Sequence, residues 1–188
     1  WDGTKYAREA WNKGHTSTSW MRDSVVWFSQ RLTTEMGMDK VKKYLAGFEF
    51  GNGDTSGGLT KFWLESWLVV SPDEQIRFWT RFWREQLPVS KHAYEMTKKI
   101  TYVETSPAGW TLHGKTGWGD EATGGWFVGH VGKGDREYVF VTRYVDRTGA
   151  VLWVVIEKDV RSDAQAAADR DGEEVTYWTS VKSETHHM

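Results

Sequence analysis

The chain of 188 residues has a net charge of -2 with acids and bases interspersed, so it presents no basic field for a nucleic-acid backbone. Its 39% hydrophobic and 27% charged residues are typical of one globular domain, and no apolar run approaches the ~20 residues that span a bilayer. The absence of cysteine excludes disulfides and thiolate metal sites. Thirteen tryptophans are unusual, and their apolar surroundings favour core packing over a stacking platform for sugars or bases.

The N-terminal part is predicted to be helical after an irregular start. Residues 1–17 carry turn formers and mixed charge, which indicate no regular element. Apolar residues recur every three or four positions over 18–32, and this spacing predicts one amphipathic helix. A second helix is predicted over 39–46, with Gly47 as its left-handed stop. Residues 52–58, rich in Gly, Asn, Asp and Ser, indicate a loop.

Two further helices have clear start signals. Residues 71–74, Ser-Pro-Asp-Glu, place a serine at the N-cap, a proline at the first helical position and a glutamate at the third, which is a capping box. The helix behind it is predicted to run to about Gln86, because the Leu-Pro pair at 87–88 stops it. Ser90 is predicted to cap another helix that ends near Ile100.

The hydrophobic period changes from helical to strand-like after Pro107. Four strands are predicted, over 110–117, 125–131, 137–145 and 150–157. Residues 132–135 and 146–149 have the Gly- and Asp-containing composition of hairpin turns. Helices first and antiparallel strands second predict an α+β fold with one shared core, and we expect residues 1–188 to form a single domain.

Beyond Glu157 the periodicity weakens. A short Ala-rich helix over 163–170 and a last strand over 174–181 are the predicted elements. The closing His186-His187 pair is typical of a tail rather than of a metal site, because no third ligand lies nearby. We therefore expect no metal.

The motif with the clearest chemistry is Lys115-Thr116-Gly117, on one predicted strand with another strand just after it. A lysine ammonium on a strand gives a fixed positive charge, and the threonine hydroxyl adds a donor for the same carboxylate. The glycine lets a substrate backbone approach closely. The triplet alone is common by chance, and an ordinary exposed strand lysine is the alternative.

Three motifs precede it in a fixed order: Ser24-Val25-Val26 in the first predicted helix, Phe50-Gly51-Asn52, and Trp63-Leu64. With Lys115-Thr116-Gly117, this order resembles the class D (oxacillinase) serine β-lactamases and the related penicillin-sensor domains of resistance regulators. The resemblance covers residues 1 to about 145. Residues 146–188 diverge, because a strand-like run stands where the family implies a terminal helix.

The resemblance implies roles for three residues around the reacting bond. Ser24 matches the serine that relays a proton to the lactam nitrogen as the ring opens. Val26 matches the residue that keeps the family's catalytic lysine in apolar surroundings, where that lysine takes up CO2 and acts as general base. Trp63 matches the tryptophan that hydrogen-bonds this carbamate. Without the resemblance, Ser24 reads as an ordinary helical hydroxyl, and Val26 and Trp63 as core residues.

The resemblance also implies how the substrate is held. Lys115 and Thr116 match the pair that binds the substrate carboxylate, and Gly117 stands beside them. The backbone N–H of Trp118 matches one half of the oxyanion hole. Asn52 matches a residue of largely architectural role, and a simple turn former is the alternative. A second carboxylate contact is not clearly matched, and Arg143, Arg147 and Arg161 are the candidates.

The chain departs from the family in lacking the reactive centre. None of its serines is followed by a lysine three positions later, so the Ser-x-x-Lys that supplies nucleophile and base is not present. The resemblance implies that this motif precedes Trp1-Asp2-Gly3, together with any export signal. We expect the chain to be a fragment that is catalytically inactive and marginally stable, with no cofactor.

Several functions remain open on these residues. The leading hypothesis is a parent protein that hydrolyses β-lactams through a serine acyl-enzyme with a carbamylated lysine, in the periplasm or outside the cell. A β-lactam sensor domain is the nearest rival, but sensors tend to have Asn where this chain has Val26. A non-catalytic aromatic-rich binding module and a fragment without present function are further alternatives. The expected partner is a β-lactam or a peptidoglycan-like small molecule.

Overall fold

The computed structural model describes residues 1–64, 67–119 and 124–143, and the backbone of 144 and 151–158. The elements are the 3-10 helix η1 Glu9–Trp11, the helices α1 Ser17–Asp23, α2 Val26–Met36, α3 Met38–Phe48, α4 Pro72–Trp83 and α5 Lys91–Thr101, and the strands β1 Tyr102–Thr105, β2 Thr111–Trp118, β3 Gly125–Lys133, β4 Arg136–Tyr144 and β5 Val151–Lys158. Within these ranges, no helix has both the length and the apolar character needed to span a bilayer.

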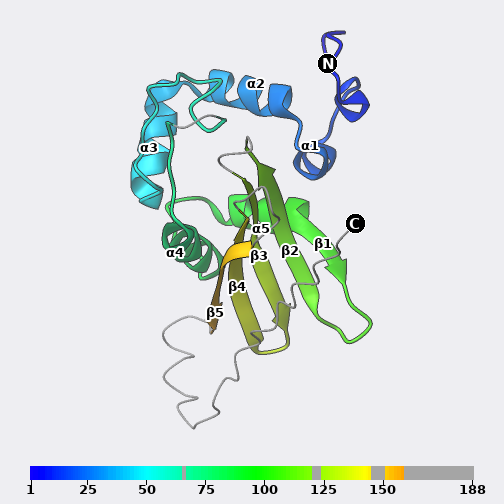
Figure 1. Cartoon of the computed structure of the whole chain (residues 1–188), viewed down its shortest axis with the longest axis vertical. Coiled ribbons are helices and arrows are strands. Elements are labelled where there is room, and N and C mark those ends of the chain that lie inside the picture. The colour runs from blue at the N-terminus through cyan, green and yellow to red at the C-terminus, as the bar shows by residue number, and fades with distance from the viewer. Residues whose placement is uncertain (65–66, 120–123, 145–150, 159–188) are drawn as a thin grey trace, which may run out of the picture.

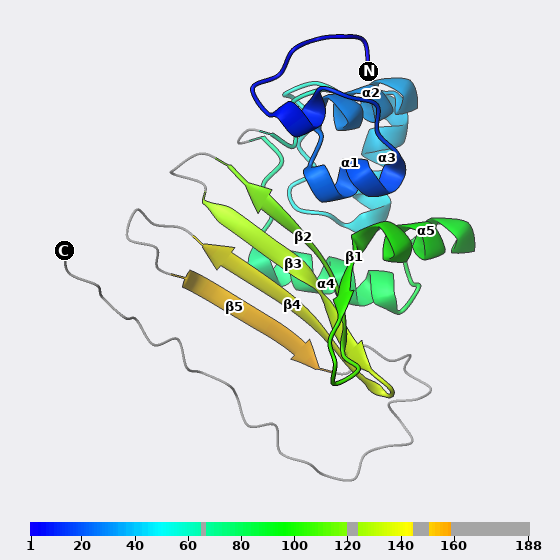
Figure 2. The same ribbon diagram turned by 90° about the vertical axis from the view of Figure 1, so that its right-hand side faces the viewer.

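The five strands form one antiparallel sheet in chain order, β1-β2-β3-β4-β5. Helices α4 and α5 lie against one face of the sheet, while α1, α2 and α3 gather at one end of it (Figure 1 and Figure 2). The predicted α+β fold is therefore confirmed.

The four predicted strands are present, but β1 was missed because a four-residue edge strand directly after α5 shows no alternation of its own. The elements predicted over 163–170 and 174–181 and the turn at 146–149 lie outside the described residues.

The predicted helix over 18–32 is in fact two helices that meet at Ser24. Ser24 has the left-handed conformation, with φ 51° and ψ 50°, and Val25 is extended. Val25 is completely buried. The prediction was wrong because apolar residues continue at helical spacing across the break, while burial of Val25 between the helices is a tertiary effect.

The predicted stop at Gly47 was also wrong. Helix α3 continues to Phe48, and Glu49 takes the left-handed position with φ 53°. Gly47 allows a close approach instead: a Cβ there would lie 3.0 Å from the Cγ atom of Pro88, a tight contact. The small residue serves close packing of α3 against the turn after α4 rather than the end of the helix.

Both predicted helix starts are confirmed. The Glu74 backbone N–H donates to Ser71 Oγ at 3.2 Å, and the Ser71 backbone N–H donates to Glu74 Oε2 at 2.8 Å, which completes the capping box. The Ala93 N–H donates to Ser90 Oγ at 3.2 Å. These local signals mark the residues at which α4 and α5 begin.

The core lies between α4, α5 and the centre of the sheet. Its members are buried apolar side chains of these elements and of the connection between the helices: Ile76, Trp79, Phe82, Leu87, Tyr94, Val128, Val139 and Val141. The Tyr94 hydroxyl donates to the Leu87 carbonyl at 2.7 Å and accepts from the Leu87 N–H at 2.6 Å. The loop and the helix are thereby joined inside the apolar core, and the Tyr94 hydroxyl is paired both as donor and as acceptor.

A histidine is buried beside this core. His130 on β3 is 4% exposed and stacks on Trp83 with ring centroids 3.7 Å apart. Neither of its ring nitrogens has a hydrogen-bond partner, and the Glu137 carboxylate is 3.8 Å away. Burial above all, with His113 and Lys98 nearby, lowers the pKa of His130 to about 4. The native state therefore holds this ring neutral.

The free energy of unfolding should consequently fall as the pH is lowered. The unfolded chain binds a proton at His130 near pH 6.5, whereas the folded chain binds it only near pH 4. The free energy of unfolding therefore does not depend on His130 above about pH 6.5, and between about pH 6.5 and 4 it falls by about 1.4 kcal/mol per pH unit. Urea unfolding between pH 7 and 5 measures this slope. His130→Gln should reduce it, whereas His92→Gln, at an exposed position of α5, should not. An undiminished slope in His130→Gln would contradict the assignment.

Candidate functional site

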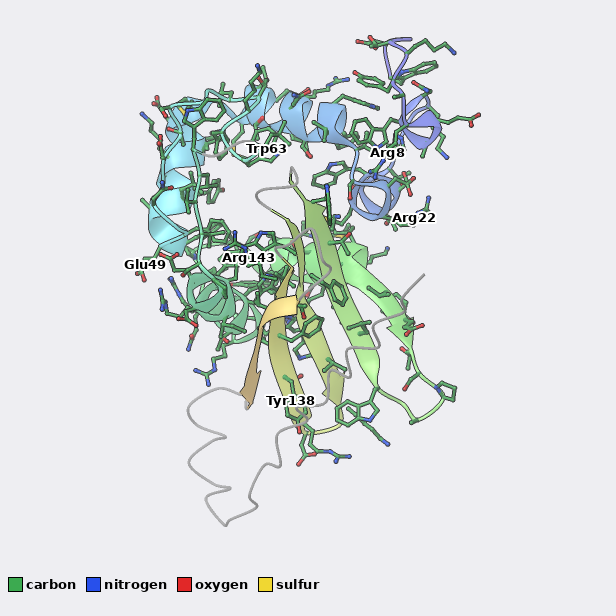
Figure 3. The ribbon with its side chains drawn as sticks, viewed as in Figure 1. Arg8, Arg22, Glu49, Trp63, Tyr138 and Arg143 are labelled. Carbon is green, nitrogen blue, oxygen red and sulfur yellow. The ribbon has the colours of Figure 1, made fainter. Side chains whose placement is uncertain are left out.

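A cleft of about 900 Å³ opens at the junction of the helical part and the ends of β2 and β3. The described residues that line it are Arg8, Trp11, Trp20, Met21, Ser24, Val26, Ser29, Trp63, Leu64, Lys115, Thr116, Gly117, Trp118, Gly125, Trp126, Phe127 and Thr142. Figure 3 shows Arg8 and Trp63 on either side of the upper end of the sheet. Residues from six separate stretches of the sequence meet here, and five of them are tryptophans.

The centre of the cleft is the contact between Lys115 and Ser24. Lys115 Nζ donates to Ser24 Oγ at 2.5 Å and to the Thr116 carbonyl at 2.6 Å. Burial and, second, the charge of Arg8 lower the pKa of Lys115. Among the described residues that line the cleft there is no aspartate or glutamate to neutralise the ammonium. A cation held this way is ready to bind an anionic ligand.

The interruption between helices α1 and α2 at Ser24 brings the hydroxyl of this residue to Lys115. In one continuous helix, residue 24 would keep helical geometry and point elsewhere. The left-handed turn between α1 and α2 instead places Ser24, half-buried, at the cleft. A non-glycine residue in this conformation is strained by about 1 kcal/mol. The strain is maintained by the packing of Val25 and by the bond from Lys115.

This strain can be measured with two variants that both remove the hydroxyl. Ser24→Gly should have a free energy of unfolding about 0.5–1 kcal/mol higher than Ser24→Ala, since only glycine adopts the left-handed turn without steric cost. Urea denaturation of the two proteins provides the comparison. Equal stabilities, or a more stable alanine variant, would show that the turn carries no strain.

The other predicted residues fall into two groups. Val26, Trp63, Thr116, Gly117 and Trp118 all line the cleft with Ser24 and Lys115. The Trp63 ring packs edge-on against buried Phe62 at 4.9 Å, which fixes its orientation, whereas Trp118 is 71% exposed.

Asn52 does not reach the cleft. Its side-chain amide donates to the Trp67 carbonyl at 2.9 Å, and its carbonyl oxygen accepts from the backbone N–H groups of Val69 and Asp54, each at 3.1 Å. Asn52 thus ties the loop after α3 to the segment before α4. Its place in the structure is architectural, as a turn former would be.

Several cleft residues were not foreseen. Arg8, Trp11, Trp20 and Thr142 were in no predicted motif, and only their place in the folded chain brings them to the site. Of the three arginines considered as a second carboxylate contact, Arg143 lies over the Trp126 ring, 5.0 Å from its centroid, and not in the cleft lining. Arg147 and Arg161 lie outside the described residues. Over the described ranges, no three His, Cys, Asp or Glu residues are grouped so that they could hold a metal ion.

Comparison with known proteins identifies the family. A sequence model described as penicillin binding protein transpeptidase domain matches residues 1–164. The chain belongs to this family. Within it, the chain is class D β-lactamase-like, as the ordered motifs predicted. The family match extends past residue 145 and includes β5.

Similar members of the family are β-lactamases. The chain is 41% identical over 163 residues to the β-lactamase OXA-1 of Escherichia coli, covering 81% of this chain and 59% of that protein. It is 41% identical over 150 residues to the probable β-lactamase YbxI of Bacillus subtilis, covering 79% and 55%. The chain thus spans between 55% and 59% of the length of these two relatives.

Solved structures agree with this placement. The class D β-lactamase from Bacillus subtilis superposes with a TM-score of 0.74 at 39% identity, covering 78% of this chain and 62% of that one. The class D β-lactamase YbXI from Nostoc gives a TM-score of 0.72 at 30% identity, covering 89% and 66%. The α+β arrangement of the transpeptidase-like domain is therefore that of class D β-lactamases.

Proposed function

We propose that the cleft is the carboxylate-binding and proton-relay part of a β-lactam site, and that the complete protein hydrolyses β-lactams through a serine acyl-enzyme. The bond of 2.5 Å between Lys115 Nζ and Ser24 Oγ, in a cleft with no described acid, carries this proposal. The named relatives are β-lactamases, which supports hydrolysis over sensing.

The chemistry follows from which group donates. Ser24 Oγ accepts a hydrogen from Lys115, so its own O–H remains available to donate to a leaving lactam nitrogen. The Lys115 ammonium, with Thr116 beside it, would hold the carboxylate of the same substrate. In this arrangement both groups would lie near the acyl carbon that a nucleophile must attack, beside the tryptophan side chains of the cleft wall.

The remaining parts of the reaction need groups outside these 188 residues. No serine here is followed three positions later by lysine, so we assign the nucleophile and the general base to another segment of the complete protein. Val26 and Trp63 would form the apolar surroundings of that base, which is proposed to be a carbamylated lysine. Action on β-lactams in the periplasm or outside the cell is proposed with it.

Two measurements on the chain with benzylpenicillin test this function. Tryptophan emission should be quenched saturably, because five tryptophans line the cleft. Intact-mass spectrometry should show no penicilloyl adduct, since the acylating serine is absent. Failure to see saturable quenching would contradict the binding site, and a stoichiometric adduct would contradict the assignment of the nucleophile to another segment.

A further inference from the structure

The cleft has more positive charge than a single carboxylate would neutralise. Lys115 and Arg8 are the cationic side chains among the described residues that line it, and none of those residues is acidic. Arg8 has no ion pair with a carboxylate in the described part of the chain, and its guanidinium lies 5.6 Å from the centroid of the Trp11 ring. A penicillin with one carboxylate, bound at Lys115, would leave Arg8 without an anionic partner.

Arg8 is held at the cleft by a well-anchored segment. Asn12 accepts from the Tyr6 N–H at 2.7 Å and donates to the Tyr6 carbonyl at 2.9 Å, which closes the chain into a tight loop around Arg8. The Trp11 indole donates to the Asp23 carbonyl at 3.0 Å, and the Trp27 indole donates to the Trp11 carbonyl at 3.0 Å. These bonds join the loop to α1 and α2, so the backbone that carries Arg8 is already ordered before the exposed side chain binds an anion.

The two cations act on each other. Both side chains line the same cleft, and the charge of Arg8 is the second cause, after burial, of the lowered pKa of Lys115, so the two cations repel each other. Such repulsion raises the energy of the empty cleft and is relieved most by a ligand that brings a negative charge to each cation.

We infer that this cleft selects β-lactams carrying two carboxylates, with Lys115 binding the carboxylate of the bicyclic nucleus and Arg8 that of the acyl side chain. The inference rests on the proposed function and adds a substrate class and a specificity-determining residue to it. The Trp11 ring provides a surface over which the Arg8 guanidinium lies.

A matched pair of ligands separates the two carboxylates. Carbenicillin is benzylpenicillin with one additional carboxylate on the side chain, so the ratio of their dissociation constants isolates that group. By tryptophan quenching at low salt, carbenicillin should bind about fivefold more tightly, and the preference should shrink as salt is added. Arg8→Gln should remove most of this preference, and Arg8→Lys, which retains the charge, should keep it.

Lys5→Gln is the matched control, because Lys5 precedes Arg8 in the same segment but is not among the residues that line the cleft. It should leave the ratio unchanged. Equal affinities for the two ligands, or a preference that persists in Arg8→Gln, would overturn the role of Arg8 while leaving the penicillin site intact. If neither ligand binds the unmodified chain, the proposed function fails and the inference fails with it.

Discussion

Gly129→Ala is expected to prevent the chain from folding. A Cβ at residue 129 would lie 2.1 Å from the His113 carbonyl oxygen and 2.9 Å from both Gly114 Cα and Phe140 Cζ. The first two obstacles are backbone of the adjacent strand, which cannot move without breaking the pairing of β2 with β3. We expect a loss of more than about 4 kcal/mol, which exceeds what most small domains can tolerate. Circular dichroism and urea unfolding provide the measurement.

The physical reason is a pair of facing glycines. Gly129 and Gly114 are opposite each other in the register of β3 and β2, and a Cβ at Gly114 would lie 2.7 Å from the Phe127 ring. Gly117→Ala is the control, because its Cβ would meet only Trp126 Cβ at 3.8 Å, an ordinary contact. It should fold with nearly unchanged stability. A folded Gly129→Ala protein of normal stability would show that the strands are not packed this closely.

Lys115→Gln is expected to weaken the binding of benzylpenicillin by about 10- to 100-fold. A charge-assisted hydrogen bond to a carboxylate contributes about 1.5–3 kcal/mol, and glutamine retains a donor but no charge. Stability should not fall with affinity: Lys115 is partly desolvated and has no acidic partner among the described cleft residues, so removal of its charge costs the fold little. Fluorescence titration and urea unfolding of the same variant measure the two effects.

Lys133→Gln provides the control for the change in net charge. Lys133 ends β3, is exposed, and is not among the residues that line the cleft. Its removal should leave the affinity for benzylpenicillin unaltered. If the two lysine variants bind equally well, the carboxylate is not held by Lys115 and the orientation proposed for the substrate is wrong.

The predictions that held were those set by local chemistry. The capping box at Ser71 needs only four consecutive residues, and strand alternation from Thr111 onward needs only neighbours on the same strand. The family resemblance, carried by the ordered motifs, implied site roles for Ser24, Val26, Trp63 and Lys115, and these four residues line one cleft. Helix caps and strand patterns can be found without knowing how the segments meet, whereas the site residues were found through the family resemblance.

Only the tertiary structure decided the rest. The break at Ser24 depends on the burial of Val25 and on a bond from Lys115, 91 residues away in the sequence, so no local period could reveal it. Gly129 is required because the backbone of the neighbouring strand β2 passes close to it. Arg8 reaches the cleft through the bonds that anchor Trp11 and Asn12. Sequence patterns report spacing along the chain, whereas close approach and charge pairing depend on distances through space, and these exist only after the core has formed.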